Sequence, residues 1–207
     1  MCGRALPRLR PLLAGLVLAI GLPLLAAADA RAADCRPLAA QAETEFGVPP
    51  GILQAIALVE SGMAGRAWAW TINANGRPFY LRTHDDAVVV AEAATRHFGT
   101  SVAVGCMQVY LRWHGDNFMD LRAMLEPANN VRYAAAYLVA LRRDHETWEA
   151  AVRHYHASNR AAQRDYLCRV LTQRAALGYQ PVTPAMRQQC AAHAALARTT
   201  AAKEGEG

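Results

Sequence analysis

The chain has 207 residues, of which 53% are hydrophobic and 19% charged, and its formal net charge is +5. Four arginines and one aspartate of that balance fall within the first 32 residues, so the remaining chain carries a net charge of only +2. This near-neutral balance argues against a nucleic-acid partner, because such domains carry a strong basic surface.

Residues 1–32 have the pattern of a secretory signal peptide. Three arginines precede an apolar stretch over residues 11–25, and Ala30-Arg31-Ala32 forms a small-residue cleavage site. An uncleaved membrane anchor is the alternative, but Pro11 and Pro23 favour cleavage. We therefore expect a periplasmic protein that has no stable membrane anchor and acts as a monomer.

Residues 33–180 are expected to form one domain, because about 150 residues suffice for a single hydrophobic core. Glycine and proline residues mark the ends of two predicted helices. The first covers 37–45, and the second starts at Pro49-Pro50 and ends at Glu60. Trp68–Ile72 and Pro78–Leu81 flank Asn75-Gly76, which predicts a small β-hairpin. Apolar periodicity predicts further helices over 85–97, 127–144, 148–157, 161–177 and 183–198.

The segment 181–207 is thus expected to be a C-terminal helix followed by a disordered tail. Four cysteines remain after removal of the signal peptide, an even number that suits an oxidising compartment. They allow three pairings, of which we favour Cys35–Cys106 with Cys168–Cys190, since the latter could join neighbouring helices. The alternative is that Cys106 is a small buried residue without a disulfide.

Glu60 stands at the end of the apolar run Gly51–Val59 and is followed by Ser61-Gly62. A carboxyl group on the last turn of a buried helix is partly desolvated, and desolvation is expected to raise its pKa. A carboxyl group with a raised pKa can serve as a proton donor near neutral pH.

Glu60-Ser61, Gly105-Cys106-Met107-Gln108 and Tyr155-His156 occur in the same order as three motifs of one family. They resemble the Glu-Ser, Gly-x-Met-Gln and Ala-Tyr-Asn motifs of the soluble lytic transglycosylases, and the resemblance covers roughly residues 35–170. It implies a mostly α, lysozyme-like single domain with one small β-hairpin. It also implies a substrate, the peptidoglycan glycan strand, whose N-acetylmuramic acid–N-acetylglucosamine bond is cleaved with formation of a 1,6-anhydro end, without any cofactor.

The same resemblance implies roles for individual residues. Glu60 acts as the acid and then as the base, and the phenol of Tyr155 reaches its carboxyl group. Ser61 either donates a hydrogen bond to that carboxyl group or caps the helix end. His156 stands where asparagine is usual, so it takes over the asparagine's role in substrate binding only provisionally.

Substrate binding is also expected from the segment around Gln108. Gly105 would let the backbone approach the sugar, because glycine has no Cβ. Met107 either packs beneath the sugar or is a core residue, and the Gln108 amide would bind the acetamido group. Asn73 and Tyr80 are further expected groove contacts, and the loop with Trp113 could line the groove.

Two other functions stay open. A hydrolase would need Asp116 or Asp120 to position water, and a cell-wall-binding scaffold would keep the fold without activity. A metal site at His154 and His156 is not expected, because residues two apart on a helix point in different directions. Local opening of the wall would also serve a secretion or conjugation machine, which is a second expected partner.

Overall fold

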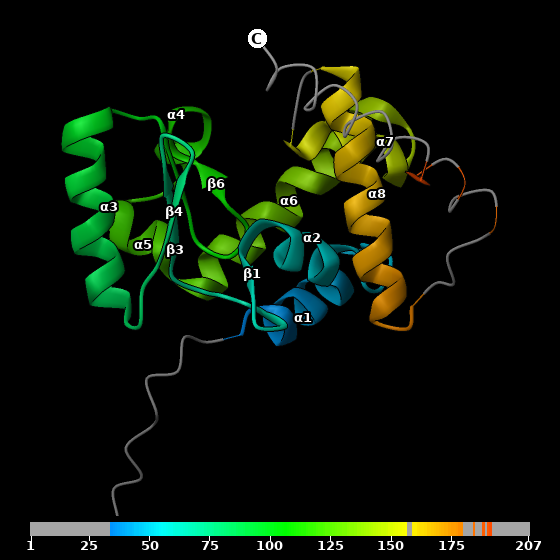
Figure 1. Cartoon of the computed structure of the whole chain (residues 1–207), viewed down its shortest axis with the longest axis horizontal. Helices are drawn as coiled ribbons and strands as arrows, with labels where there is room; N and C mark the ends of the chain where they lie inside the picture. The colour runs from blue at the N-terminus through cyan, green and yellow to red at the C-terminus, as the bar shows by residue number, and fades with distance from the viewer. Residues whose placement is uncertain (1–33, 157–158, 180–183, 185–187, 189, 192–207) are drawn as a thin grey trace, which may run out of the picture.

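The computed structural model describes residues 34–156, 159–179, 184, 188 and 190–191. The predicted fold class is confirmed, because most of the described residues are helical (Figure 1). The helices are α1 (Arg36–Phe46), α2 (Ile52–Ser61), α3 (His84–Phe98), α4 (Leu111–His114), α5 (Leu121–Leu125), α6 (Pro127–His145), α7 (Trp148–His156) and α8 (Arg160–Ala176). The predicted signal peptide and most of the predicted final helix lie outside the described residues.

The start of α2 differs from the prediction. Pro49 and Pro50 precede the helix, and Gly51 is its N-cap with a left-handed φ of 84°. The buried carboxylate of Glu43 accepts the backbone N–H groups of Gly51 at 2.8 Å and Gln54 at 3.1 Å. A side chain from α1 therefore satisfies N–H groups that the first turn of a helix leaves unpaired.

The predicted hairpin is confirmed and belongs to a larger sheet. Strands β3 (Thr71–Ala74) and β4 (Arg77–Tyr80) pair antiparallel through Asn75-Gly76, whose φ angles of 50° and 77° suit a two-residue turn. The sheet has the order β4-β3-β5-β6, with β5 (Val102–Val104) and β6 (Val109–Tyr110). A separate pair consists of β1 (Gly62–Met63) and β2 (Arg66–Ala67).

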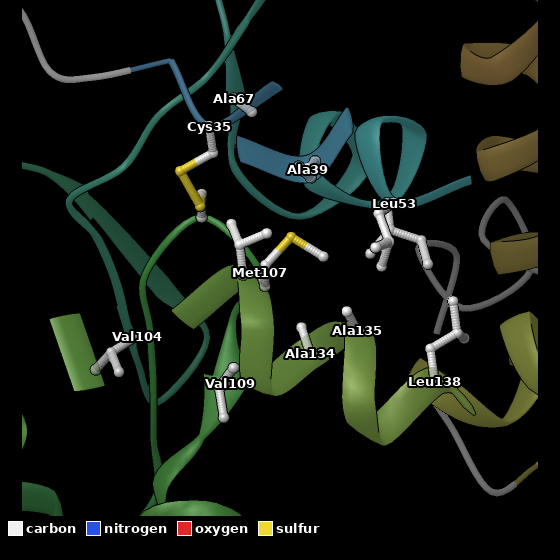
Figure 2. Close-up of a cluster of buried hydrophobic side chains, with 14 of the residues drawn as sticks. Cys35, Ala39, Leu53, Ala67, Val104, Met107, Val109, Ala134, Ala135 and Leu138 are labelled. Atoms are coloured by element: carbon white, nitrogen blue, oxygen red, sulfur yellow. A yellow bond between two sulfur atoms is a disulfide. The ribbon is translucent and has the colours of Figure 1, made fainter. Parts of the chain in front are cut away.

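The core lies between these elements. Figure 2 shows three of the buried apolar side chains: Leu53 of α2, Leu138 of α6, and Met107, which follows β5. The Cys35–Cys106 disulfide joins the start of α1 to the segment after β5, and Cys168–Cys190 is also formed. Both favoured pairings are therefore confirmed.

The segment from Gly105 to Gln108 is a tight turn built around one buried side chain. Asn130 of α6 accepts the Met107 N–H at 2.9 Å and donates to the Val104 carbonyl at 3.0 Å and the Met124 carbonyl at 3.1 Å. Gly105 has a φ of 80°, and a Cβ placed there would come within 2.4 Å of the Asn130 amide. Asn130 and Gly105 together fix the conformation of the turn.

Figure 1 shows the sheet and α3 on one side of the molecule and α7 and α8 on the other, with α6 between them. Helix α2 packs against α1 and α8, and its C-terminal end continues directly into β1. No helix within the described ranges is long and apolar enough to cross a membrane.

Candidate active site

A cavity of about 950 Å³ lies between the sheet and helices α6 and α7. Asn73 of β3 and Val109 of β6 line its sheet side, and Tyr137 of α6 and Tyr155 of α7 line its helix side. Glu60, near the end of α2, also lines it. The cavity therefore brings together residues from all three predicted motifs.

The Glu60 side chain is largely buried, with 11% of its surface exposed. Its Oε1 accepts a hydrogen bond from the Tyr166 hydroxyl at 2.7 Å, and the Nδ1 of His156 lies 3.7 Å from the same oxygen. The His156 ring stacks on the Tyr166 ring, with centroids 4.5 Å apart and planes 3° apart. Burial, followed by the Glu60 charge, raises the pKa of Tyr166 well above 10, so this phenol stays a donor.

The expected contact between Tyr155 and Glu60 is wrong. The Tyr155 hydroxyl donates to the Met107 carbonyl at 2.9 Å, and Tyr166 contacts the carboxyl group in its place. Tyr166 is fully buried on the face of α8 that also carries Gln163, Leu167 and Val170. This i, i+3, i+4, i+7 stripe was visible in the sequence and could have indicated that Tyr166 faces inward.

Ser61 does not contact the carboxyl group. Its hydroxyl lies 3.0 Å from the Ala57 carbonyl and 2.9 Å from the Cys106 carbonyl, two acceptors that its single proton can serve. The first of these bonds stays within α2, and the second joins the helix end to the 105–108 turn. Ser61 was expected either to donate a hydrogen bond to the Glu60 carboxyl group or to cap the helix end. These contacts support the second role.

Gly105 and Met107 do not line the cavity. The close approach that Gly105 permits is to Asn130 rather than to a sugar. Met107 is fully buried in the core, and its N–H and carbonyl are engaged by Asn130 and Tyr155. Of the two alternatives for Met107, the structure therefore supports the core residue, and Gly105 is buried against Asn130 instead of facing the cavity.

Gln108 and Asn73 do line the cavity. The Gln108 amide N–H₂ donates to the Gly105 carbonyl at 2.9 Å and the Thr71 carbonyl at 3.3 Å, which leaves its carbonyl oxygen for a ligand. Tyr80 does not line this cavity, since its ring packs edge-on against Trp68 at a centroid distance of 6.4 Å on the exposed strand β4. The structure places Tyr80 outside this cavity, and its contact with a glycan stays a prediction.

His154 and His156 point to different sides of α7. His156 lies beside Glu60, whereas the His154 ring stacks on His145 with centroids 3.7 Å apart. Burial, and then the charges of His145 and Arg153, lower the pKa of His154. Among the described residues, no group of three or more His, Cys, Asp or Glu side chains could hold a metal ion.

Among the described residues that line the cavity, Glu60 is the only carboxylate. Asp85 pairs with Arg122 at 2.8 Å, and Asp86 contacts the N-cap residue Thr83 at the start of α3. Asp120 caps α5 by accepting the Ala123 N–H at 2.7 Å. Asp116 is exposed in the short 3₁₀ helix Gly115–Asn117 and does not line the cavity.

One comparison with known proteins identifies a family for this chain. A family model described as "Transglycosylase SLT domain" matches residues 37–167, which include Glu60, Gln108 and Tyr166. No curated protein and no solved structure matches the chain.

Proposed function

The chain belongs to the transglycosylase SLT domain family, and on this basis we propose that Glu60 cleaves the glycan strand of peptidoglycan as a combined acid and base. Family membership implies lytic transglycosylase activity on peptidoglycan. The bond concerned is the β-1,4 linkage between N-acetylmuramic acid and N-acetylglucosamine, and the product carries a 1,6-anhydromuramic end. The observation that supports this mechanism is that the part of the chain described by the structure gives the cavity a single carboxylate.

Glycosidases that add water generally use two carboxyl groups, one on each side of the bond. A site with one carboxyl group suits a substrate that supplies its own nucleophile. The neutral Glu60 gives its proton to the glycosidic oxygen as the bond to C1 breaks. The resulting carboxylate takes the proton of the C6 hydroxyl as O6 bonds to C1, so Glu60 regains its proton and no water is consumed.

The contacts of Glu60 distinguish its two oxygens. Oε1 accepts the Tyr166 hydroxyl and has His156 beside it. The transferable proton is therefore assigned to Oε2, which has no hydrogen-bond partner among the described residues. Tyr166 holds the carboxyl group so that Oε2 meets the scissile bond. The free carbonyl oxygen of Gln108 accepts the acetamido N–H of the sugar.

The product mass tests the proposal. We expect the protein to release fragments from purified sacculi whose muramic ends are one water lighter than reducing ends. A lysozyme-type hydrolase would give reducing ends only, and that result would reject the lyase mechanism. If the protein releases no fragments, the remaining alternative is a cell-wall-binding scaffold that keeps the fold without activity.

Replacement of Tyr166 with phenylalanine is expected to lower turnover about tenfold or more, because Glu60 becomes a carboxylate as it gives up its proton and a hydrogen bond to a charged group contributes about 1.5–3 kcal/mol. The rate of fragment release from sacculi measures this effect. Tyr155→Phe is the comparison variant, since its hydroxyl bonds to the Met107 carbonyl and not to Glu60. A larger rate loss in Tyr155→Phe than in Tyr166→Phe would contradict the assignment.

The two disulfides favour an oxidising compartment, and we propose export to the periplasm on that ground. Service to a secretion or conjugation machine stays a prediction, because no contact within the described residues bears on it. The same holds for the monomeric state.

A further inference from the structure

His156 is the residue at which this chain departs from the motif that it resembles, since asparagine is usual there. An asparagine amide has no ring, whereas the imidazole of His156 lies flat on the Tyr166 ring, with centroids 4.5 Å apart and planes 3° apart. Tyr166 is fully buried in α8, so its ring is a fixed platform for an imidazole that is itself 44% exposed. The stack therefore restricts how the imidazole can turn at the end of α7.

In this orientation the imidazole faces the Glu60 carboxyl group. The Nδ1 of His156 lies 3.7 Å from Oε1 of Glu60, which is beyond hydrogen-bond distance, and the Tyr166 hydroxyl donates to the same oxygen at 2.7 Å. A shortening of about 0.8 Å brings Nδ1 to the ordinary N–H···O distance of about 2.9 Å. Oε1 can accept from both groups, because a carboxyl oxygen has two lone pairs. The ring nitrogen that faces an acceptor carries the proton, so neutral His156 has its proton on Nδ1.

The proposed reaction has one step that needs a second donor, the loss of the Glu60 proton. The Glu60 side chain is 11% exposed, so little water is at hand to solvate the carboxylate that forms. Donors that already face a developing charge lower the barrier, because they need no reorganisation as the reaction proceeds. Tyr166 is one such donor, and the Nδ1–H of His156 is placed to be the second.

We infer that His156 is a positioning residue for this reaction, whose Nδ1–H closes on Oε1 of Glu60 as the carboxylate forms. Glu60 gives its Oε2 proton to the glycosidic oxygen and then takes the proton of the C6 hydroxyl, while His156 keeps its own proton throughout. The stack on Tyr166 guides the imidazole, so that both donors meet at Oε1 and leave Oε2 to the substrate. The inference rests on the proposed function, and it directs His156 to the carboxyl group instead of to the sugar.

Two replacements separate the donor from the ring. His156→Phe keeps a flat ring that can stack on Tyr166 but has no N–H, and His156→Asn has the polar group that is usual in the motif but no ring. Formation of anhydro ends from soluble glycan strands prepared from sacculi gives kcat and KM for each variant. We expect kcat to fall about tenfold in both, as for the loss of one hydrogen bond to a charged group. KM should stay within about twofold of the parent, because the bond strengthens only in the transition state.

A histidine that binds the sugar, or one that only supports the fold, gives a different result. Addition of His156→Phe to the Glu60→Gln protein should leave its affinity for an N-acetylglucosamine hexamer unchanged in calorimetric titration, and the melting temperature should stay that of the parent. A raised KM with parental kcat, or a weaker affinity for the hexamer, would make His156 a sugar contact and overturn the inference. A loss of kcat that comes with a lower melting temperature would overturn it in favour of packing.

His97→Phe is the matched control. His97 is an exposed histidine of α3 whose ring lies 4.5 Å from that of Phe98, and it does not line the cavity. The same chemical change there should leave kcat within about twofold of the parent. The parent protein separates the two proposals. A parent that forms no anhydro ends rejects the reaction itself, whereas anhydro ends formed by His156→Phe at the parental kcat reject only the role of His156.

Discussion

Replacement of Glu60 with glutamine is expected to lower the rate of fragment release from sacculi by about a thousandfold, within the range of about 10²–10⁴ typical of general acid–base catalysis. Glutamine has nearly the same shape, and its amide oxygen can still accept the Tyr166 hydroxyl. It carries no proton that it can transfer to the glycosidic oxygen. The rate loss should therefore occur without a change in the melting temperature.

Glu92→Gln is the control for this variant. Glu92 is an exposed carboxylate on α3, 3.9 Å from Arg96, and it does not line the cavity. The same chemical change at this position should leave the rate within about twofold of the parent, since an exposed ion pair contributes little. Fragment release by Glu60→Gln at the rate of the Glu92→Gln protein would end the catalytic assignment of Glu60.

Replacement of Asn130 with alanine is expected to lower the free energy of unfolding by about 3–5 kcal/mol. The change leaves the Met107 N–H and the Val104 and Met124 carbonyls without the partner that the structure gives them. Each buried polar group that loses its partner costs about 1–3 kcal/mol. Since domains are stable by only about 5–15 kcal/mol, denaturant titration should show a much lower midpoint.

The adjacent asparagine provides the control. Asn129 is exposed, and its amide donates a single hydrogen bond to the Ala123 carbonyl at 3.0 Å. Asn129→Ala should cost less than about 1.5 kcal/mol, the net value of one hydrogen bond. Similar losses in the two variants would show that Asn130 does not hold the 105–108 turn by these bonds.

The sequence predicted the long helices well, because their apolar residues recur with helical spacing between glycines and prolines. It did not predict α4 or α5, which have four and five residues. Segments of that length are too short to show a period, so their conformation depends on the tertiary contacts around them.

The candidate site was predictable where a motif coincides with a helix end or a turn. Glu60 and Gln108 both line the cavity, as their motifs indicated. The partner of Glu60 was not predictable from the motifs, because Tyr155 and Tyr166 lie on different helices and their rings stack at 6.4 Å. Only the packing of α7 and α8 decides which of the two hydroxyls reaches the carboxyl group.

The disulfide between Cys35 and Cys106 has a consequence for the 105–108 turn. It covalently links the start of the folded domain to the turn that carries Gln108, and both cysteines are fully buried. In a chain with reduced thiols this bond is missing, so the 105–108 turn is held by non-covalent contacts alone. Formation of this covalent link depends on thiol oxidation, so the turn that carries Gln108 gains its full constraint only in an oxidising compartment.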